Sequence, residues 1–219
     1  VSALFSSESL ELLDYFIPSN EAFLRANDAD IGSGAPIVMP NHEIIGGGKD
    51  GRVFVLDSNN LGGFNPQDQN LQTIQTGVKR LDNIWGAPAY WNGNLYYHTE
   101  GDVLKAYGWD GRLLTVNPIA RGSKIYEVHG ASPSISANGI ADGIVWEVED
   151  SGYDPNGGAA AILHAYDATN AHQLYDSKQA GSRDTAGAAA KFSVPTIADG
   201  HVFVPTSNQL VVYGLLNVP

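Results

Sequence analysis

The sequence predicts an all-β fold built from repeated four-stranded antiparallel units, and three observations lead to this prediction. A short phrase with proline at its centre recurs four times, at steps of about 52, 45 and 62 residues. Each copy is followed by short runs rich in β-branched and aromatic residues, separated by Gly, Asn and Asp turns. Sustained helical periodicity is absent, and only residues 20–25 have room for a helical turn. The phrases are centred on Pro36, Pro88, Pro133 and Pro195.

The second copy shows the expected unit most clearly. After Pro88, apolar runs at residues 94–98 and 103–107 are separated by a Gly-Asp turn. A further turn around Asp110 leads into a fourth run, residues 112–116. Runs joined in this way are typical of an antiparallel meander. We therefore expect residues 112–116 to form the last strand of this unit.

The other copies repeat this order with different loop lengths. The third copy has the longest loop, through Gly152 and Gly158, which explains the longest step between prolines. The fourth copy stops after three strands. Further strands are expected at residues 43–45, 52–57, 71–74, 143–148, 161–167, 173–175, 201–204 and 210–213.

Units of this length, arranged radially, make the blades of a β-propeller. We expect a single propeller part over residues 1–219, with the strands that follow the four prolines innermost. The expected blades are approximately residues 1–32 (partial), 33–84, 85–130, 131–192 and 193–219 (partial).

The ends of the chain leave two arrangements open. Residues 2–6 and 10–17 read as two strands without a preceding proline phrase. In one arrangement, residues 10–17 complete the last blade and close a ring of four blades. In the other, which we favour, the chain is half of a ring of seven or eight blades. Because a half-ring exposes two apolar blade faces, a missing propeller half or a partner chain is then expected to cover them.

Composition narrows the classes of function. The net charge of −12, from 24 acidic and 12 basic residues, argues against nucleic acid and anionic membrane surfaces as partners. The absence of cysteine excludes disulfides, thiolate metal ligands and a cysteine nucleophile within the chain. No apolar run approaches the length that spans a membrane. We expect a secreted or periplasmic protein, with which this composition is compatible.

Several phrases resemble one family of repeat proteins. They lie at residues 14–18, 26–34, 48–51, 60–63, 181–184, 191–192 and 209–216. Through these phrases, the chain resembles the C-terminal half of PQQ-like β-propeller repeat proteins. The resemblance is to a secreted bacterial branch of the quinoprotein alcohol dehydrogenase-like superfamily. The resemblance covers essentially the whole chain. It implies a complete propeller about twice as long, with seven or eight blades.

The resemblance gives Lys49 a candidate role. In quinoprotein alcohol dehydrogenases, a basic residue in a phrase similar to Lys49-Asp50-Gly51 followed by an aromatic strand contacts the quinone carbonyls. A cation there would stabilise the oxyanion that forms on a reduced quinone. The resemblance thus implies PQQ, with calcium, as cofactor. The alternative is that Lys49 belongs to an ordinary polar hairpin turn.

The second candidate site is the loop that carries Asn27, Asp28 and Asp30. Acidic residues near a propeller axis would serve as calcium ligands or a general base, as in the quinoprotein enzymes. The alternative is an Asx turn before the strand at Pro36. Trp85, which opens the second proline phrase, either packs between blades or stacks on a ligand at the axis. We therefore take Lys49, Trp85 and Asp30 as candidate cofactor-binding residues and predict no dedicated metal site.

Two classes of function remain open at this point. The first is a secreted binding or scaffold propeller that presents the loops of one face to a protein or glycan. The second is a PQQ-dependent dehydrogenase that oxidises an alcohol or sugar. The fold does not decide between them. The first is favoured because the chain lacks the cysteine pair of some quinoprotein enzymes and shows no further calcium ligands.

Overall fold

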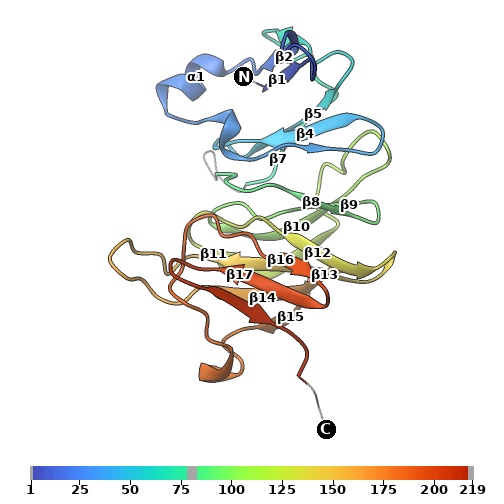
Figure 1. Cartoon of the computed structure of the whole chain (residues 1–219). Helices are drawn as coiled ribbons and strands as arrows, with labels where there is room; N and C mark the ends of the chain where they lie inside the picture. The colour runs from blue at the N-terminus through green and yellow to red at the C-terminus, as the bar shows by residue number, and fades with distance from the viewer. Residues whose placement is uncertain (1, 78–82, 217–219) are drawn as a thin grey trace.

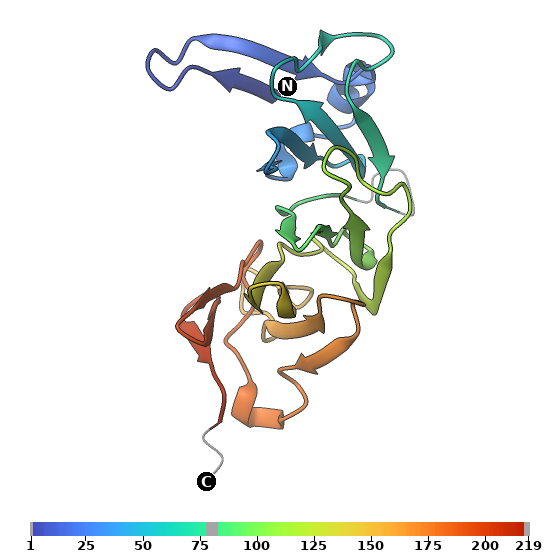
Figure 2. The same cartoon turned by 90° about the vertical axis from the view of Figure 1, so that its right-hand side faces the viewer.

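The computed structural model describes residues 2–77 and 83–216, and in this part of the chain five β-sheets follow one another. The sheets stack as an open arc, with the N-terminus at one end and the C-terminus at the other (Figure 1, Figure 2). Helical structure among these residues is limited to α1 (Glu21–Ala26), η1 (Ile31–Ser33) and η2 (Gly181–Asp184). The all-β prediction is confirmed, and α1 lies where a helical turn was expected.

Three sheets have four antiparallel strands each, in chain order from one edge to the other. The first contains β3 (Ile37–Val38), β4 (Glu43–Gly47), β5 (Arg52–Asp57) and β7 (Gln72–Gln75). The second contains β8 (Ala89–Trp91), β9 (Asn94–Tyr97), β10 (Asp102–Gly108) and β11 (Ala120–Tyr126). The third contains β12 (Ser134–Asn138), β13 (Ala141–Glu149), β14 (Ile162–Asp167) and β15 (Gln173–Asp176).

A smaller sheet stands at the N-terminal end of the arc. Strands β1 (Ser2–Phe5) and β2 (Leu12–Ile17) form an antiparallel pair, as the two runs near the N-terminus predicted. The short strand β6 (Gly63–Phe64), from the loop between β5 and β7, pairs with β2 in parallel. This pairing was not predicted. It depends on Gly62 and Gly63, whose φ angles of 92° and 60° turn the loop towards β2.

The sheet at the C-terminal end has three strands, β16 (Thr196–Ala198), β17 (His201–Pro205) and β18 (Leu210–Tyr213). Within the described residues, β18 pairs with β17 alone, and β2 pairs with β1 and β6. The alternative of a closed four-bladed ring required β2 to pair with β18, and it is therefore wrong. The arrangement matches a partial propeller.

One predicted strand is wrong. Residues 112–116 do not form the last strand of their sheet, because that position belongs to β11. Leu114 makes only an isolated bridge to Trp109, and its backbone N–H and C=O bond the Gln72 side chain of the preceding sheet, at 2.9 and 2.7 Å. The apolar run thus docks against a neighbouring sheet. Strand β11 was missed because its side chains alternate between exposed and half-buried positions, with few apolar residues.

The first strands of successive sheets lie innermost. Strand β8 contacts β12, and β12 in turn contacts β16. Contacts of this kind arise when radially arranged sheets point their first strands at a common axis. Each of these strands follows one of the recurring prolines, as the repeat predicted.

No sheet has an apolar core of its own, and the core lies instead between neighbouring sheets. Four clusters of buried side chains fill the four successive interfaces. Tyr96 and Tyr97 are adjacent in β9, yet they enter different clusters, because successive side chains of a strand point to opposite faces. Burying each such side chain contributes roughly 1.5–3 kcal/mol.

A buried polar seam crosses the interface between the second and third four-stranded sheets. His98 Nδ1 lies 2.8 Å from Glu147 Oε2, and both side chains are fully buried. His98 Nε2 lies 2.9 Å from the backbone oxygen of Asp102, and the His98 ring stacks on Tyr126 with centroids 3.9 Å apart. The Tyr126 and Tyr166 hydroxyls bond each other at 3.1 Å. These bonds fix the register between the two sheets.

Both ends of the arc present apolar side chains to solvent. At the N-terminal end, Leu13 is 59% exposed and Tyr15 is 38% exposed. At the C-terminal end, Leu210 and Val212 point away from the interior and are 61% and 51% exposed. No helix among the described residues is long and apolar enough to cross a membrane.

The buried pair between His98 and Glu147 gives a test of the interface. Replacing Glu147 with Ala leaves His98 without its carboxylate partner in a site closed to water. Glu147→Ala is therefore expected to lower the free energy of unfolding by about 3–5 kcal/mol, measured by urea denaturation. The exposed control Glu127→Ala is expected to change it by less than about 0.5 kcal/mol. Equal unfolding midpoints for the two variants would show that the seam carries little stability.

Candidate functional site

The connections between sheets, and the turns between the second and third strands of each sheet, gather along one edge of the stack. This edge, called the loop face below, lies on the left in Figure 1. Backbone hydrogen bonds link its parts: Lys49 N–H donates to Asp30, Ile84 N–H to Gly48 and Glu100 N–H to Asn83. The antiparallel order brings these loops together, because every second connection returns to the same edge.

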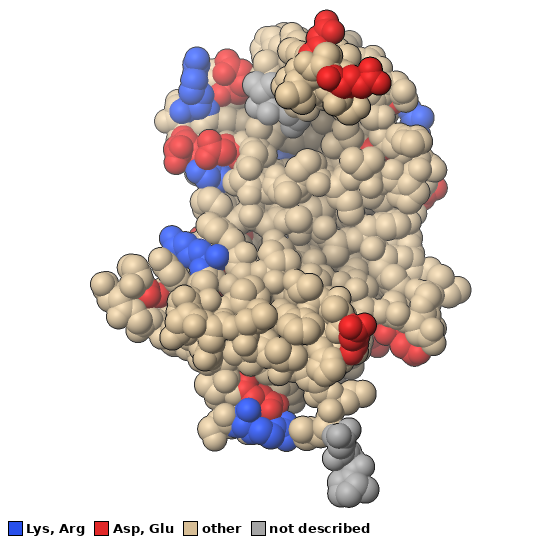
Figure 3. Space-filling model, in the orientation of Figure 1, with Lys and Arg blue, Asp and Glu red and all other residues tan. Residues whose placement is uncertain are grey.

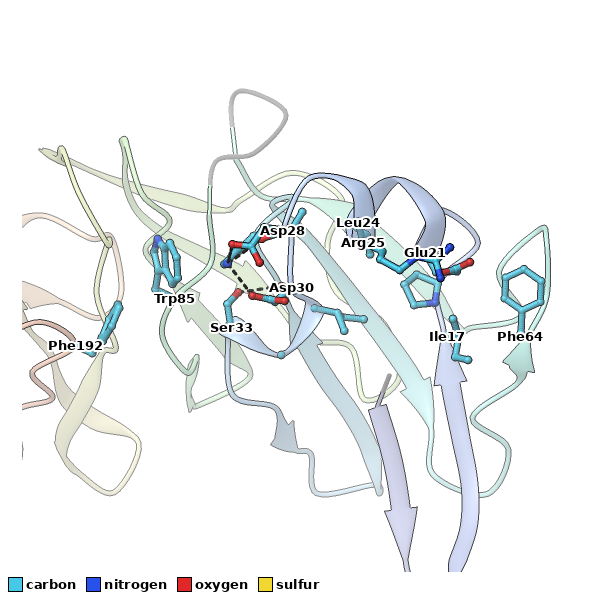
Figure 4. A pocket seen from close by; sticks show the side chains of 15 residues that line it. Ile17, Glu21, Leu24, Arg25, Asp28, Asp30, Ser33, Phe64, Trp85 and Phe192 are labelled. Atoms are coloured by element: carbon cyan, nitrogen blue, oxygen red, sulfur yellow. Dashed lines mark hydrogen bonds and ion pairs between the residues drawn. The ribbon is translucent and has the colours of Figure 1, made fainter.

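A cavity of about 1240 Å³ opens on the loop face. In Figure 4, Trp85 and Phe192 stand at one end, Ile17 and Phe64 stand at the other, and charged side chains lie between them. Figure 3 shows acidic and basic side chains next to one another along the upper left margin, beside a broad uncharged surface. The charged residues that line the cavity are Glu21, Arg25, Asp28, Asp30 and Lys49.

A polar network fixes α1 as one wall of the cavity. Arg52 Nε donates to Asp50 at 2.6 Å, and its Nη2 donates to the Asn20 side chain just before α1. Ser19 donates to Asp68 through its hydroxyl, at 2.9 Å. These bonds tie the start of α1 to the β4–β5 turn and to the β6–β7 loop. The helix is too short to hold its position without them.

Lys49 lies in the β4–β5 turn, beside the cavity, and its side chain is only 14% exposed. Its ammonium group contacts Asp30 Oδ2 at 2.7 Å, Asp28 Oδ2 at 3.2 Å and the backbone oxygen of Asp28 at 2.8 Å. An ammonium has three protons to donate, so all three have acceptors here. The hydrogen bond to Asp30 raises the pKa of Lys49 above its usual value, and the group stays charged at neutral pH.

Trp85 lies between Lys49 and Phe192. The ammonium nitrogen of Lys49 is 5.2 Å from the Trp85 ring centroid, and the Phe192 ring centroid is 5.7 Å away. The indole N–H donates to Glu100 Oε2 at 2.7 Å. Trp85 is held in one orientation by these three contacts: the Lys49 cation, the Phe192 ring and the hydrogen bond of the indole N–H.

A second aromatic pair on the loop face was missed in the sequence. His129 and Phe192 have ring centroids 5.0 Å apart, and both have φ 61°, in the left-handed region. Such angles cost about 1–3 kcal/mol each for bulky residues. Asp150, which is 3% exposed, offsets this cost: its carboxylate oxygens lie 3.1 Å from His129 Nδ1, and Phe192 N–H donates to it at 3.1 Å.

These aromatic residues share one signal in the sequence. Trp85 and Phe192 each stand three residues before the proline of their repeat, and His129 stands four residues before its own. Successive copies of the repeat thus deliver their side chains to neighbouring places on the loop face. Comparison of the copies position by position would have found all three.

The structure places all three candidate residues, Lys49, Trp85 and Asp30, at the same cavity. Asp28 joins them through Lys49, whereas the Asn27 side chain donates to the Phe23 backbone oxygen at the end of α1. Within residues 2–77 and 83–216, no group of three or more His, Asp or Glu side chains is arranged to hold a metal ion. With its two carboxylate partners, Lys49 forms a charge cluster beside the cavity.

No protein-family model and no curated protein sequence matches the chain. Solved structures are similar in fold. Quinohemoprotein alcohol dehydrogenase from Comamonas testosteroni is 14% identical with a TM-score of 0.54, over 99% of this chain and 40% of that one. BamB from Moraxella catarrhalis is 14% identical with a TM-score of 0.55, over 83% of this chain and 45% of that one.

A third similar structure is itself a β-propeller domain. The Cps50 (Swd1) beta-propeller domain of Myceliophteria thermophila is 7% identical with a TM-score of 0.53. The match covers 94% of this chain and 60% of that domain. The chain thus spans about half the length of these proteins. At such low identity the likeness shows the fold alone, and the fold of this chain is that of a β-propeller, present in part.

Replacing Lys49 with Met keeps the length of the side chain and removes its three donors. Because the partner carboxylates are largely exposed, the free energy of unfolding is expected to fall by about 1 kcal/mol or less. Residues 27–33 are expected to exchange their amide hydrogens faster, measured by mass spectrometry, since the bond to the Asp28 backbone is lost.

The control for this variant is Lys178→Met, which replaces an exposed lysine far from the cavity. The pKa of Lys49 is raised on folding, so the charged ammonium stabilises the folded state. This stabilisation is fully present at pH values below the usual lysine pKa of 10.5, and it is lost as the pH rises through the raised pKa. Unchanged exchange in residues 27–33 would contradict the assignment of Lys49 as the residue that holds this loop.

Proposed function

We propose that this chain is part of a β-propeller that acts as a binding or scaffold module and takes its ligand in the cavity on the loop face. The observation that carries the proposal is the set of hydrogen bonds that the Lys49 ammonium makes. The ammonium is held by three acceptors of the chain itself, so it organises the cavity wall. A wide cavity with apolar ends and polar groups between them is typical of a binding site.

The second candidate function, a PQQ-dependent dehydrogenase, is favoured by one observation: Lys49, Trp85 and Asp30 meet at a single cavity. The donor set nevertheless does not fit the cofactor. A quinone oxygen would have to displace Asp28 or Asp30 from Lys49, and a stacked quinone would have to displace Lys49 or Phe192 from the Trp85 ring. We therefore derive no redox step for this site.

We further propose that additional propeller blades, on the same polypeptide or on a partner chain, cover the two ends of the arc. The exposed Leu13 and Tyr15 at one end, and Leu210 and Val212 at the other, support this. A covering blade would bury these side chains as the interior interfaces bury theirs. A secreted or periplasmic location remains our prediction.

Mixing the protein with PQQ and calcium tests the choice between the two functions. We expect no shift of the quinone absorbance and no alcohol-dependent reduction of an electron-accepting dye, since Lys49 has no free donor. Turnover that disappears in Lys49→Ala, with the fold intact by circular dichroism, would favour the dehydrogenase.

The covering of the arc predicts the behaviour of residues 1–219 in isolation. With both end faces open, the chain is expected to self-associate, as measured by sedimentation velocity. Replacing both Leu210 and Val212 with Lys is expected to shift the population towards monomer, because it places charge on one end face. The same pair of lysines at the exposed positions Thr115 and Asn117, away from the ends, is the control. A chain that is monomeric without any substitution would argue against the covering blades.

A further inference from the structure

The polar groups of the cavity restrict the chemistry of its ligand. Asp28 and Asp30 each use Oδ2 for Lys49, and their Oδ1 atoms have no partner among the described residues. These two side chains are 90% and 60% exposed, so these acceptors face outward from the wall. Arg25, on the neighbouring wall, is exposed and forms no ion pair with any of the described residues. The site thus offers free acceptors and a free donor together.

Charge argues against a strongly ionic ligand. Three carboxylates, Glu21, Asp28 and Asp30, line the cavity beside two cations, Arg25 and Lys49. A cationic ligand would satisfy the carboxylates and oppose the guanidinium, and an anion would do the reverse. Hydroxyl groups both donate and accept, so a polyhydroxyl ligand satisfies both kinds of group without an unbalanced charge.

Aromatic surface supplies the second half of the recognition. Phe192 is 50% exposed, and Asp150 holds the residue at a left-handed φ that a phenylalanine rarely adopts. Strain that is maintained by a buried carboxylate marks a side chain whose position matters. A half-exposed ring at one end of the cavity, with carboxylate acceptors on the far side of Trp85, fits a ligand with C–H faces and hydroxyl edges, which is the surface of a sugar ring (Figure 4).

His129 lines a small pocket that adjoins this end of the cavity and shares Trp85 and Phe192 with it. Its Nδ1 faces Asp150, which fixes the ring, and its Nε2 has no partner among the described residues. The His129 side chain is 16% exposed. His129 thus presents one oriented nitrogen beside Phe192 and Trp85.

We propose that the loop-face cavity binds a neutral oligosaccharide, with Asp28, Asp30 and Arg25 bonding its hydroxyls and Phe192 packing on a sugar face. This deepens the proposed binding function and rests on it. The size of the cavity, about 1240 Å³, exceeds the usual range for small-molecule sites, so more than one sugar ring has room. Lys49 and Asp150 are positioning residues, since they hold Asp28, Asp30, His129 and Phe192 in place.

Isothermal titration of the protein with the neutral sugars cellopentaose, xylopentaose, maltopentaose and penta-N-acetylchitopentaose tests the proposal. At least one is expected to bind, with an affinity that changes little between low and high NaCl, because the sugar carries no charge for the cavity's charged side chains to attract. Asp28→Asn and Phe192→Ala are each expected to raise the dissociation constant about tenfold, through the lost acceptor and the lost ring surface. The matched control Asp142→Asn replaces an exposed aspartate outside the cavity and is expected to leave binding unchanged.

The remaining outcomes separate this proposal from the proposed function. If no oligosaccharide binds, or if binding is indifferent to Asp28→Asn and Phe192→Ala, the saccharide proposal is overturned. If a lysine- and arginine-containing peptide binds instead, with an affinity that falls steeply with salt and depends on Asp28, the saccharide proposal is also wrong but the binding function stands. If PQQ binds there and supports turnover, both are wrong.

Discussion

The whole architecture depends on one constraint: a sheet of this chain buries its apolar faces only against the next sheet. The four buried clusters lie between successive sheets, and neighbouring residues of one strand, such as Tyr96 and Tyr97, serve two different interfaces. Stability is therefore a sum over neighbours, as in other repeat proteins. The same constraint leaves the first and last sheets with uncovered faces.

Stacking the sheets in this way also creates the cavity. Because each sheet begins at the axis and ends at the rim, every connection to the next sheet returns to the same edge, which lies on the left in Figure 1. Trp85 and Phe192 lie more than a hundred residues apart in the chain, yet their rings touch there. The proposed site is thus a product of the repeat: equivalent positions of different copies supply its aromatic side chains.

Within the site, a charged residue whose hydrogen bonds are all made to the protein itself supports the cavity wall and does not contact a ligand. Lys49 has a sequence context that resembles a quinone-contacting residue, but two carboxylates and a backbone oxygen accept hydrogen bonds from all three of its N–H groups. Asp150 plays the corresponding part behind the Phe192 end of the cavity, where one buried carboxylate bonds His129 and the backbone of Phe192. Both residues therefore act on the shape of the cavity. In the proposed site, the ligand contacts the residues that Lys49 and Asp150 hold in place, such as Asp28 and Phe192.

The sequence alone was enough to predict the all-β class, the recurring four-stranded unit and the innermost place of the strands after Pro88, Pro133 and Pro195. These follow from local rules, since turn residues and alternating apolar runs act over a few positions. It also singled out Lys49, Trp85 and Asp30, which meet at one cavity.

Only the tertiary structure decided what depends on distant partners. Residues 112–116 have the composition of a strand, but Gln72 of another sheet holds Leu114, and the more polar β11 takes the edge position. The parallel pairing of β6 with β2 and the clamp of Asp150 on His129 and Phe192 likewise join segments far apart in the chain. Local propensity carries no information about such contacts, because their free energy is gained only when the sheets have already stacked.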